Sequence, residues 1–504
     1  MGESSAILES SRRVSTGVSG LDGILEGGLT PNRIYLLEGD PGTGKTTLAL
    51  QFMLDGLRKG ETCLYITLSE TAEELDSVAR SHGWDVGRLS IFEMTPPEAR
   101  LDPDQQYTLL HPSEVELGET TKLIFEKIEE LKPDRVAFDS LSELRLIAQD
   151  PLRYRRQVLA LKQFFAGRQC TALLLDDLTS HSPELQLHSI AHGVIVLQRV
   201  TREYGVERRR MRVIKMRGAD FHAGFHDFMI QRGGILVFPR LLLVEATDGL
   251  SGEKIESGVP AMDALLGEGV DRGTSMLLLG PAGVGKSSLA TRYALAAVER
   301  GEKAAIYTFD EARHTLIARS KGLGMNLEPY LKTGALAMEQ VNAAELSPGQ
   351  FAHRVRERVV RQDTSVVVID SMNSYLNAMP AEQFLVMQMH ELLAFLNQRG
   401  VLSILVMAQH GLLGQMPTPV DLSYLTDTVV LLRYFEFQGA VRKAISVVKK
   451  RSGPHESTIR EYRLGPDGVG VGPPLAEFHG VLTGVPTYAG EAASLHKDGH
   501  GRAG

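Results

Sequence analysis

The chain has 504 residues, which suits two or three domains, and its 43% apolar and 23% charged residues are typical of a soluble globular protein. The formal net charge of −8 argues against a protein that coats nucleic acid, because such a protein needs a basic surface. The two cysteines, Cys63 and Cys170, lie in apolar strand-like runs, so the sequence offers no disulfide framework and no zinc site. No run reaches the ~20 apolar residues of a membrane span, and we expect a cytoplasmic protein.

The sequence repeats itself at an offset of 241 residues. The matching positions are residues 15–22 and 256–263, Lys45 and Lys286, and Glu70 and Glu311. An offset that stays constant over such a distance indicates duplication, and each copy is long enough to be a whole domain. We therefore divide the chain into a flexible N-terminal segment (1–13), a first domain (14–245), a second domain (246–489) and a flexible tail (490–504).

Apolar β-rich runs alternate with helix-length amphipathic stretches in each half. In the first half we expect strands at residues 33–38, 62–67, 135–139 and 171–175, and a strand of alternating character at 211–217. Continuous apolar strands separated by helices are typical of a parallel sheet covered on both faces. The sequence therefore predicts an α/β fold, present twice, with a mostly parallel central sheet flanked by helices.

Each half contains the pattern G-x-x-x-x-G-K-[ST], placed between an apolar strand and a helix. Its glycines let backbone N–H groups turn inward around a β-phosphate, the helix N-terminus adds its dipole, and the lysine bridges the β- and γ-phosphates. This context predicts two tandem RecA-like P-loop NTPase domains that bind ATP with Mg²⁺. The expected ATP-binding residues are Gly39, Asp40, Pro41, Gly42, Thr43, Gly44, Lys45, Thr46 and Thr47, and Gly280, Pro281, Ala282, Gly283, Val284, Gly285, Lys286, Ser287 and Ser288.

A magnesium site needs oxygen ligands beside each phosphate loop. We expect the hydroxyls of Thr46 and Ser287 to bind Mg²⁺ directly, and Asp139 and Asp370, each at the end of an apolar strand, to hold it through water. The alternative for each aspartate is that it only caps the helix that follows.

Hydrolysis needs a carboxylate that orients and deprotonates the attacking water. In RecA-like ATPases this acid follows the strand after the phosphate-loop helix. The second half offers two acids there, Asp310 and Glu311, whereas the first half offers Ser69 and then Glu70. We therefore expect the second domain to carry most of the turnover. The alternative is that these acids only favour a helix N-terminus.

Two cations lie close together late in each half. Lys215 with Arg217, and Lys449 with Arg451, are two residues apart on predicted strands, so each pair faces one surface. Such pairs suit a triphosphate of a neighbouring subunit, as an arginine finger does. A solvated strand face is the alternative.

These features together resemble the KaiC family, the circadian-clock ATPases and their relatives outside that clock. The resemblance runs from about residue 14 to 488 and includes Thr-Gly-Val-Ser-Gly-Leu-Asp at 16–22, the segment at 423–432, Ile-Arg-Glu-Tyr at 459–462 and Gly-Val-Pro-Thr at 484–487. It implies a homohexameric two-tier ring with ATP at subunit interfaces. It further implies ATPase activity in the first tier, autokinase activity in the second, and a trans role for the four late cations.

Departures from the family pattern indicate a relative outside the clock. Ser69 replaces the first of two acids, and the second-domain pair is Asp-Glu. The Ser-Thr phosphorylation pair becomes Ser423-Tyr424, while Thr418 matches a nearby family threonine. We expect one dominant phosphorylation site, Ser423, and a Tyr424 side chain that packs against the protein or stays unmodified.

Two other function classes stay open. A RecA/RadA-like DNA-dependent ATPase would need basic or aromatic DNA loops, which neither the segment after Asp139 nor the one at 411–420 supplies. Nucleic acid and membrane are therefore not the expected partners. An ATP-stabilised scaffold with little turnover is the other alternative. If the protein is an ATPase ring, its expected partners are regulatory or signalling proteins, and the sequence does not identify them.

Overall fold

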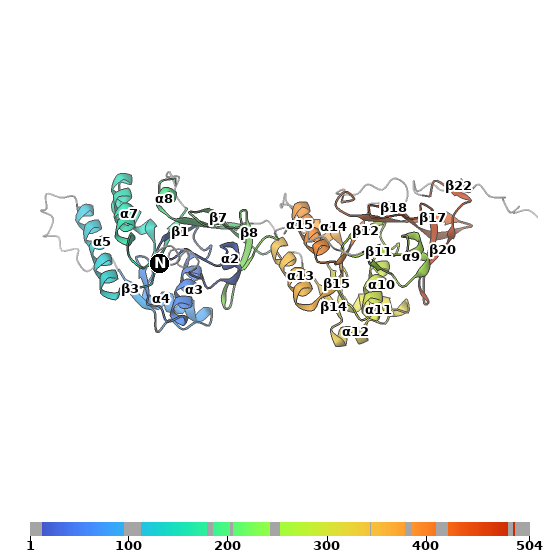
Figure 1. Ribbon diagram of the computed structural model, residues 1–504, viewed down its shortest axis with the longest axis horizontal. Coiled ribbons are helices and arrows are strands. Elements are labelled where there is room, and N and C mark those ends of the chain that lie inside the picture. The colour runs from blue at the N-terminus through green and yellow to red at the C-terminus, as the bar shows by residue number, and fades with distance from the viewer. Residues whose placement is uncertain are drawn as a thin grey trace, which may run out of the picture. The chain divides into compact units, whose positions relative to one another are not determined.

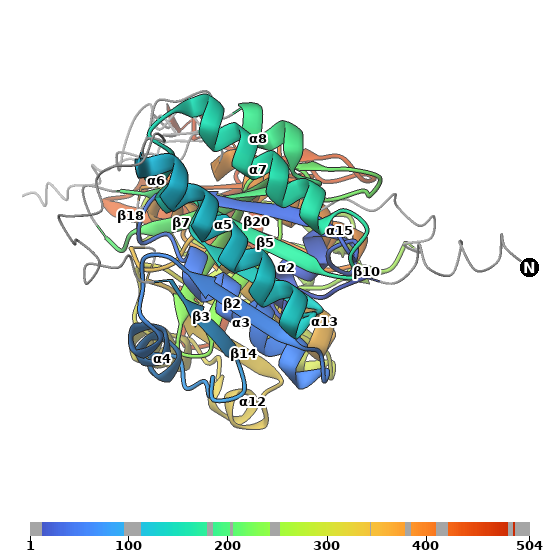
Figure 2. The ribbon, with the colours of Figure 1, turned by 90° about the vertical axis from the view of Figure 1, so that its left-hand side faces the viewer.

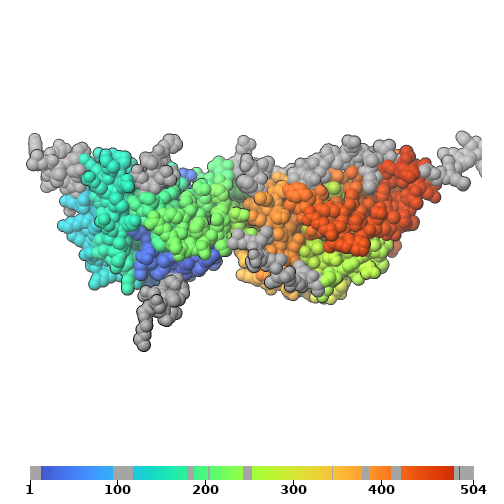
Figure 3. Space-filling view, turned by 45° about the horizontal axis from the view of Figure 1, so that its top comes forward, coloured from blue at the N-terminus to red at the C-terminus, as the bar shows by residue number. Residues whose placement is uncertain are grey.

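The computed structural model describes residues 13–94, 112–178, 185–201, 205–241, 252–342, 344–377, 385–409, 422–481 and 487–488. They form two compact units, Met1–Arg240 and Leu241–Gly504, drawn from blue to green and from yellow to red in Figures 1 and 3. Several sequence expectations lie wholly or mostly outside the described residues: the N-terminal segment 1–13, the change of domain near 245, the tail 490–504, Thr418 and most of 484–487.

The first unit is built on a nine-stranded sheet in the order β3-β2-β4-β5-β1-β6-β7-β8-β9. All pairs from β3 to β6 are parallel, and the pairs from β6 to β9 are antiparallel. The strands are β1 (Ile34–Gly39), β2 (Cys63–Thr67), β3 (Ser90–Glu93), β4 (Arg135–Asp139), β5 (Thr171–Asp177), β6 (Gly193–Val200), β7 (Arg208–Met216), β8 (His226–Gln231) and β9 (Gly234–Phe238).

Helices cover both faces of this sheet, which explains its continuous apolar strands. Along β1, Tyr35 and Leu37 pack into one cluster with α3, whereas Ile34 and Leu36 pack on the other face with α5, α6 and α7, which Figure 2 shows side by side. The helices are α2 (Ser19–Ile24), α3 (Lys45–Arg58), α4 (Ala72–Ser81), α5 (Pro112–Leu131), α6 (Leu141–Ala148), α7 (Pro151–Phe165) and α8 (Leu185–Ile190).

The second unit repeats this sheet strand by strand, in the order β14-β13-β15-β16-β12-β17-β18-β19-β20. Its strands are β12 (Ser275–Gly280), β13 (Lys303–Thr308), β14 (Leu336–Gln340), β15 (Thr364–Asp370), β16 (Leu402–Ala408), β17 (Thr428–Phe437), β18 (Ala440–Lys450), β19 (Arg460–Gly465) and β20 (Gly468–Pro474). Two short hairpins add β10 (Lys254–Ile255) with β11 (Val270–Asp271) and β21 (Phe478–His479) with β22 (Thr487–Tyr488).

The helices of the second unit also lie on both sheet faces. One cluster gathers α9 and α10 with β12, and a separate cluster gathers α13 and α15 on the other face. The helices are α9 (Pro260–Leu265), α10 (Lys286–Glu299), α11 (Arg313–Gly322), α12 (Glu328–Thr333), α13 (Pro348–Gln362), α14 (Met372–Asn377) and α15 (Leu385–Gln398). The predicted fold class, two tandem α/β domains with mostly parallel sheets, is confirmed. Among the described helices, none has the length and apolar character to cross a membrane.

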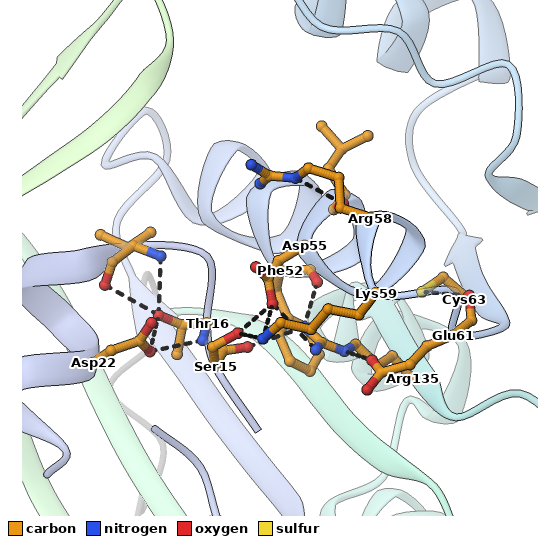
Figure 4. Close-up of polar contacts among 12 residues, drawn as sticks. Ser15, Thr16, Asp22, Phe52, Asp55, Arg58, Lys59, Glu61, Cys63 and Arg135 are labelled. Carbon is orange, nitrogen blue, oxygen red and sulfur yellow. Dashed lines mark hydrogen bonds and ion pairs between the residues drawn. The ribbon is translucent and has the colours of Figure 1, made fainter. Parts of the chain in front are cut away.

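A buried arginine ties four segments of the first unit together (Figure 4). Arg135, at the start of β4, is 1% exposed. Its guanidinium pairs with Asp55 at 3.2 Å and with Glu61, and donates to the carbonyl oxygens of Ser15 (2.9 Å) and Phe52 (2.8 Å). Asp55 and Phe52 lie on α3, so Arg135 fixes the end of the phosphate-loop helix against the strand that carries Asp139.

Candidate functional site

Each phosphate loop joins the end of a central strand to the first turn of a helix. The loops follow β1 and β12 and open α3 and α10, whose N-cap residues are Gly44 (φ 107°) and Gly285 (φ 113°). A Cβ at Gly44 would lie 2.7 Å from Ile230, and one at Gly285 would lie 2.6 Å from Leu464. Only glycine fits this left-handed conformation and this space, so the backbone can curve as an anion cradle requires.

The loop lysines are buried and fold back over their own loops. Lys45 donates to the carbonyl oxygen of Gly39 at 2.8 Å, and Lys286 donates to those of Gly280 (2.9 Å) and Pro281 (2.7 Å). Burial lowers the pKa of Lys286 to about 8, against a smaller opposing effect of Asp370. A buried cation of this kind favours an anionic ligand such as a phosphate.

In the first domain a carboxylate already pairs with the lysine. Asp177, the last residue of β5, lies 2.5 Å from the Nζ of Lys45. The strand register places Gly39 beside Asp177 and Gly280 beside Ala408. Alanine therefore occupies the matching place in the second domain, and the two loops differ in the charge that faces their lysines.

The predicted magnesium residues lie together at the ends of parallel strands. In the first domain Thr46 donates to Asp139 at 3.1 Å, and the buried Tyr65 hydroxyl donates to the same carboxylate oxygen at 2.7 Å. Burial raises the pKa of Asp139, while these hydrogen bonds oppose the shift. Burial likewise raises the pKa of Asp370, and a hydrogen bond with Ser287 opposes it. Hydroxyl and carboxylate oxygens are the donors that Mg²⁺ prefers, so both sets fit the ion.

Glu70 is half-buried near Asp139, three residues after the end of β2. Its Oε2 has no hydrogen-bond partner among the described residues. Burial raises the pKa of Glu70, and the negative charges of Asp139 and Glu74 add to the shift. The helix that follows is capped by Thr71 and Glu74 in a capping box, so Glu70 is not needed as the helix cap. A desolvated carboxyl with a free oxygen is suited to accept a proton.

The two acids of the second domain are both engaged, in different ways. Asp310 accepts hydrogen bonds from Ser371 (2.7 Å) and Ser374. Glu311 instead pairs with Arg319 through both carboxylate oxygens, at 3.1 and 2.8 Å. Glu311 and Arg319 line a pocket of about 420 Å³ together with Lys286, Ser287 and Ser288. Of the two acids, only Glu311 lines this pocket.

The late cations bind the segment that precedes the sixth strand of each sheet, which is helix α8 in the first domain and a turn at residues 423–425 in the second. Lys215 donates to the carbonyl oxygen of His188, and Arg217 to that of Ser189 at 2.7 Å. In the second domain Lys449 donates to the carbonyl oxygens of Ser423 (2.6 Å) and Thr426 (2.7 Å), and Arg451 to that of Tyr424 (2.8 Å). In both domains the two cations thus converge on one short segment, which in the second domain contains the predicted phosphorylation site. Tyr424 is 56% exposed, so it does not pack against the protein, and that it stays unmodified remains a prediction.

Two polar residues at the phosphate loops have no counterpart in the sequence predictions. Asp177 ends an apolar strand and so carries a signal like that of Asp139, which a search of strand-end acids would have found. Arg319 lies in mid-helix among other charged residues, and nothing in its spacing marks it.

Comparison with known proteins identifies the family. The model of the family described as ATPase: KaiC matches residues 14–241 and again residues 255–476. The chain is 26% identical to the circadian clock protein KaiC3 of Synechocystis sp., over 95% of both chains. It is 27% identical to the circadian clock oscillator protein KaiC of Thermostichus vulcanus and 26% identical to that of Synechococcus elongatus, each over 94% of this chain and 92% of the relative. The chain therefore belongs to the KaiC family of ATP-binding ATPases, with one KaiC domain in each half.

Proposed function

We propose that the protein is a magnesium-dependent ATPase ring in which both domains bind ATP and hydrolyse it to ADP and phosphate. The observation that carries the proposal is the pocket that joins Lys286, Ser287 and Glu311, and the first domain has Lys45, Thr46 and Glu70 at the corresponding positions of the sequence repeat. Thr46 with Asp139, and Ser287 with Asp370, would hold Mg²⁺, which supplies positive charge to the phosphates.

The carboxylates provide the base for hydrolysis. Glu70 in the first domain, and Glu311 in the second, takes a proton from a water molecule whose oxygen bonds to the γ-phosphorus. The bond from that phosphorus to the β,γ-bridging oxygen breaks, and ADP and phosphate leave. The loop lysine stabilises the charge on the phosphate oxygens throughout.

Phosphate release separates this function from a scaffold with little turnover. Lys45→Ala and Lys286→Ala should each remove the turnover of one domain, and the double variant should release no phosphate above background. Comparing Glu70→Gln with Glu311→Gln then shows which domain is faster, and we expect the larger loss from Glu311→Gln. Release that survives in the Lys45→Ala/Lys286→Ala protein would refute hydrolysis at these loops. Stimulation of the wild type by single-stranded DNA would favour the DNA-dependent alternative.

We further propose that the ring is a homohexamer with nucleotide at subunit interfaces, where Lys215 and Arg217, or Lys449 and Arg451, reach a neighbour's phosphates. The support is that each pair converges on one short segment of its own domain, residues 188–189 for Lys215 and Arg217 and residues 423–426 for Lys449 and Arg451. Light scattering should give a hexamer with Mg·ATP and smaller species for Lys45→Ala. Hexamers of Lys45→Ala would refute assembly through first-domain ATP.

The second domain is also proposed to phosphorylate Ser423 from a neighbour's ATP. Lys449 and Arg451 bind the backbone of this very segment, so the cations that reach a γ-phosphate also carry the serine toward it. The serine oxygen bonds to the γ-phosphorus, its proton passes to Glu311 or Asp310, and ADP leaves. Peptide mass spectrometry after incubation with Mg·ATP should find phosphate on Ser423 in the wild type and none in Lys286→Ala. An unmodified wild type that still hydrolyses ATP would refute the autokinase.

A further inference from the structure

Arg319 occupies a central place in the second-domain pocket. It lies on α11, and three of its guanidinium nitrogens donate to two different residues. Nε and Nη2 donate to the two oxygens of Glu311, and Nη1 donates to the hydroxyl of Ser288 at 2.6 Å. Ser288 belongs to the first turn of α10, directly after the proposed magnesium ligand Ser287. The guanidinium therefore connects the acid to the phosphate-loop helix.

The first domain has no cation at the matching place. Helices α4 and α11 correspond residue for residue at the offset of 241, so Val78 matches Arg319. Val78 packs against the hydrophobic core of its domain. Glu70, the counterpart of Glu311, accordingly keeps an oxygen without a hydrogen-bond partner among the described residues. Glu311 is thus bound by an arginine, whereas its counterpart Glu70 has no arginine at the matching position.

We propose that Arg319 is a positioning residue for hydrolysis in the second domain, holding the carboxylate of Glu311 toward the phosphate loop. A planar guanidinium that donates to both carboxylate oxygens fixes the plane of the carboxylate as well as its position. Each oxygen keeps a second lone pair with which to accept a proton from water. The bond to Ser288 fixes the guanidinium in turn to the helix that holds the phosphates. This inference rests on the proposed ATPase activity of the second domain.

The test uses the full chain with Glu70→Gln, so that the second domain supplies the measured turnover. Arg319→Met should lower kcat for phosphate release about ten- to a hundredfold, as loss of a group that orients an active residue does, and change KM for ATP by less than about threefold. Arg319→Lys should recover part of kcat. Arg313→Met, an exposed arginine on the same helix, is the matched control and should leave both constants unchanged.

Combining variants separates positioning of Glu311 from a general structural role. If Arg319 acts through Glu311, then Arg319→Met should have no further effect once Glu311 is changed to Gln. Equal losses in the two backgrounds, an unchanged kcat, or a raised KM with kcat unchanged would overturn the inference. If Glu70→Gln alone, with Arg319 intact, releases no phosphate, then the proposed second-domain hydrolysis fails and this inference fails with it.

Discussion

The buried Arg135 cluster gives the sharpest test of how the first domain is held together. Changing Arg135 to Met keeps an unbranched side chain of similar length but removes the charge and five N–H donors. Removing one partner from a buried ion pair typically costs 3–5 kcal/mol, because the other partner stays buried and unpaired. Asp55 and Glu61 are 15% and 26% exposed, so water screens part of their charge. We therefore expect the low end, a loss of about 3 kcal/mol in the free energy of unfolding.

The single tryptophan of the chain makes this loss measurable in the first domain alone. Trp84 is partly buried against the first-domain core, and its ring lies 4.7 Å from that of His82. Its fluorescence should follow urea unfolding of the first domain without ATP, with a midpoint about 1 M lower in Arg135→Met. Arg33→Met removes an exposed arginine and should change stability by less than about 0.5 kcal/mol. A loss below about 1 kcal/mol in Arg135→Met would refute the reasoning.

Two further predictions follow from the shifted pKa values at the nucleotide sites. Because burial raises the pKa of Glu70, the carboxyl takes up a proton at a higher pH than an ordinary glutamate, so phosphate release by a Lys286→Ala protein should fall as the pH is lowered from neutral toward 5. Lys286, with its pKa lowered to about 8, is about 90% charged at pH 7 and about 10% charged at pH 9, so calorimetry of a Lys45→Ala protein should show ATP affinity falling about tenfold between them. Phosphate release that does not change between neutral pH and pH 5 would contradict the first prediction, and an ATP affinity that does not change between pH 7 and pH 9 would contradict the second.

The sequence predicted those parts of the site that depend on local order along the chain. A phosphate loop is one continuous stretch, so its glycines, lysine and hydroxyl are all readable from one motif. Asp139 and Asp370 are readable too, since each ends an apolar strand and the carboxyl ends of parallel strands meet at one edge of the sheet. The duplication strengthened both predictions, because the same pattern stands twice at one offset.

What the sequence could not predict depends on which side chains meet across elements. The spacing of Asp310 and Glu311 does not say which of them lines the pocket. Ser371 and Ser374 bind Asp310, whereas Arg319 on α11 binds Glu311. These contacts determine which of the two acids lines the pocket. Such contacts join residues up to 64 positions apart, so no periodic pattern in the sequence can reveal them.

The two domains share one fold but differ in the charged residues that lie beside their phosphate loops. In the first, Asp177 neutralises Lys45, and Glu70 stands beside Asp139 without a cation in the described residues. In the second, alanine replaces that aspartate, and Arg319 adds a positive charge to the same pocket. A phosphate that enters the first site must compete with a carboxylate for the lysine. One that enters the second meets a lysine whose hydrogen bonds, within the described part of the chain, go to backbone carbonyls. We therefore expect the repeated motif to determine where ATP binds, and residues outside the motif to set the ATP affinity and the turnover of each domain.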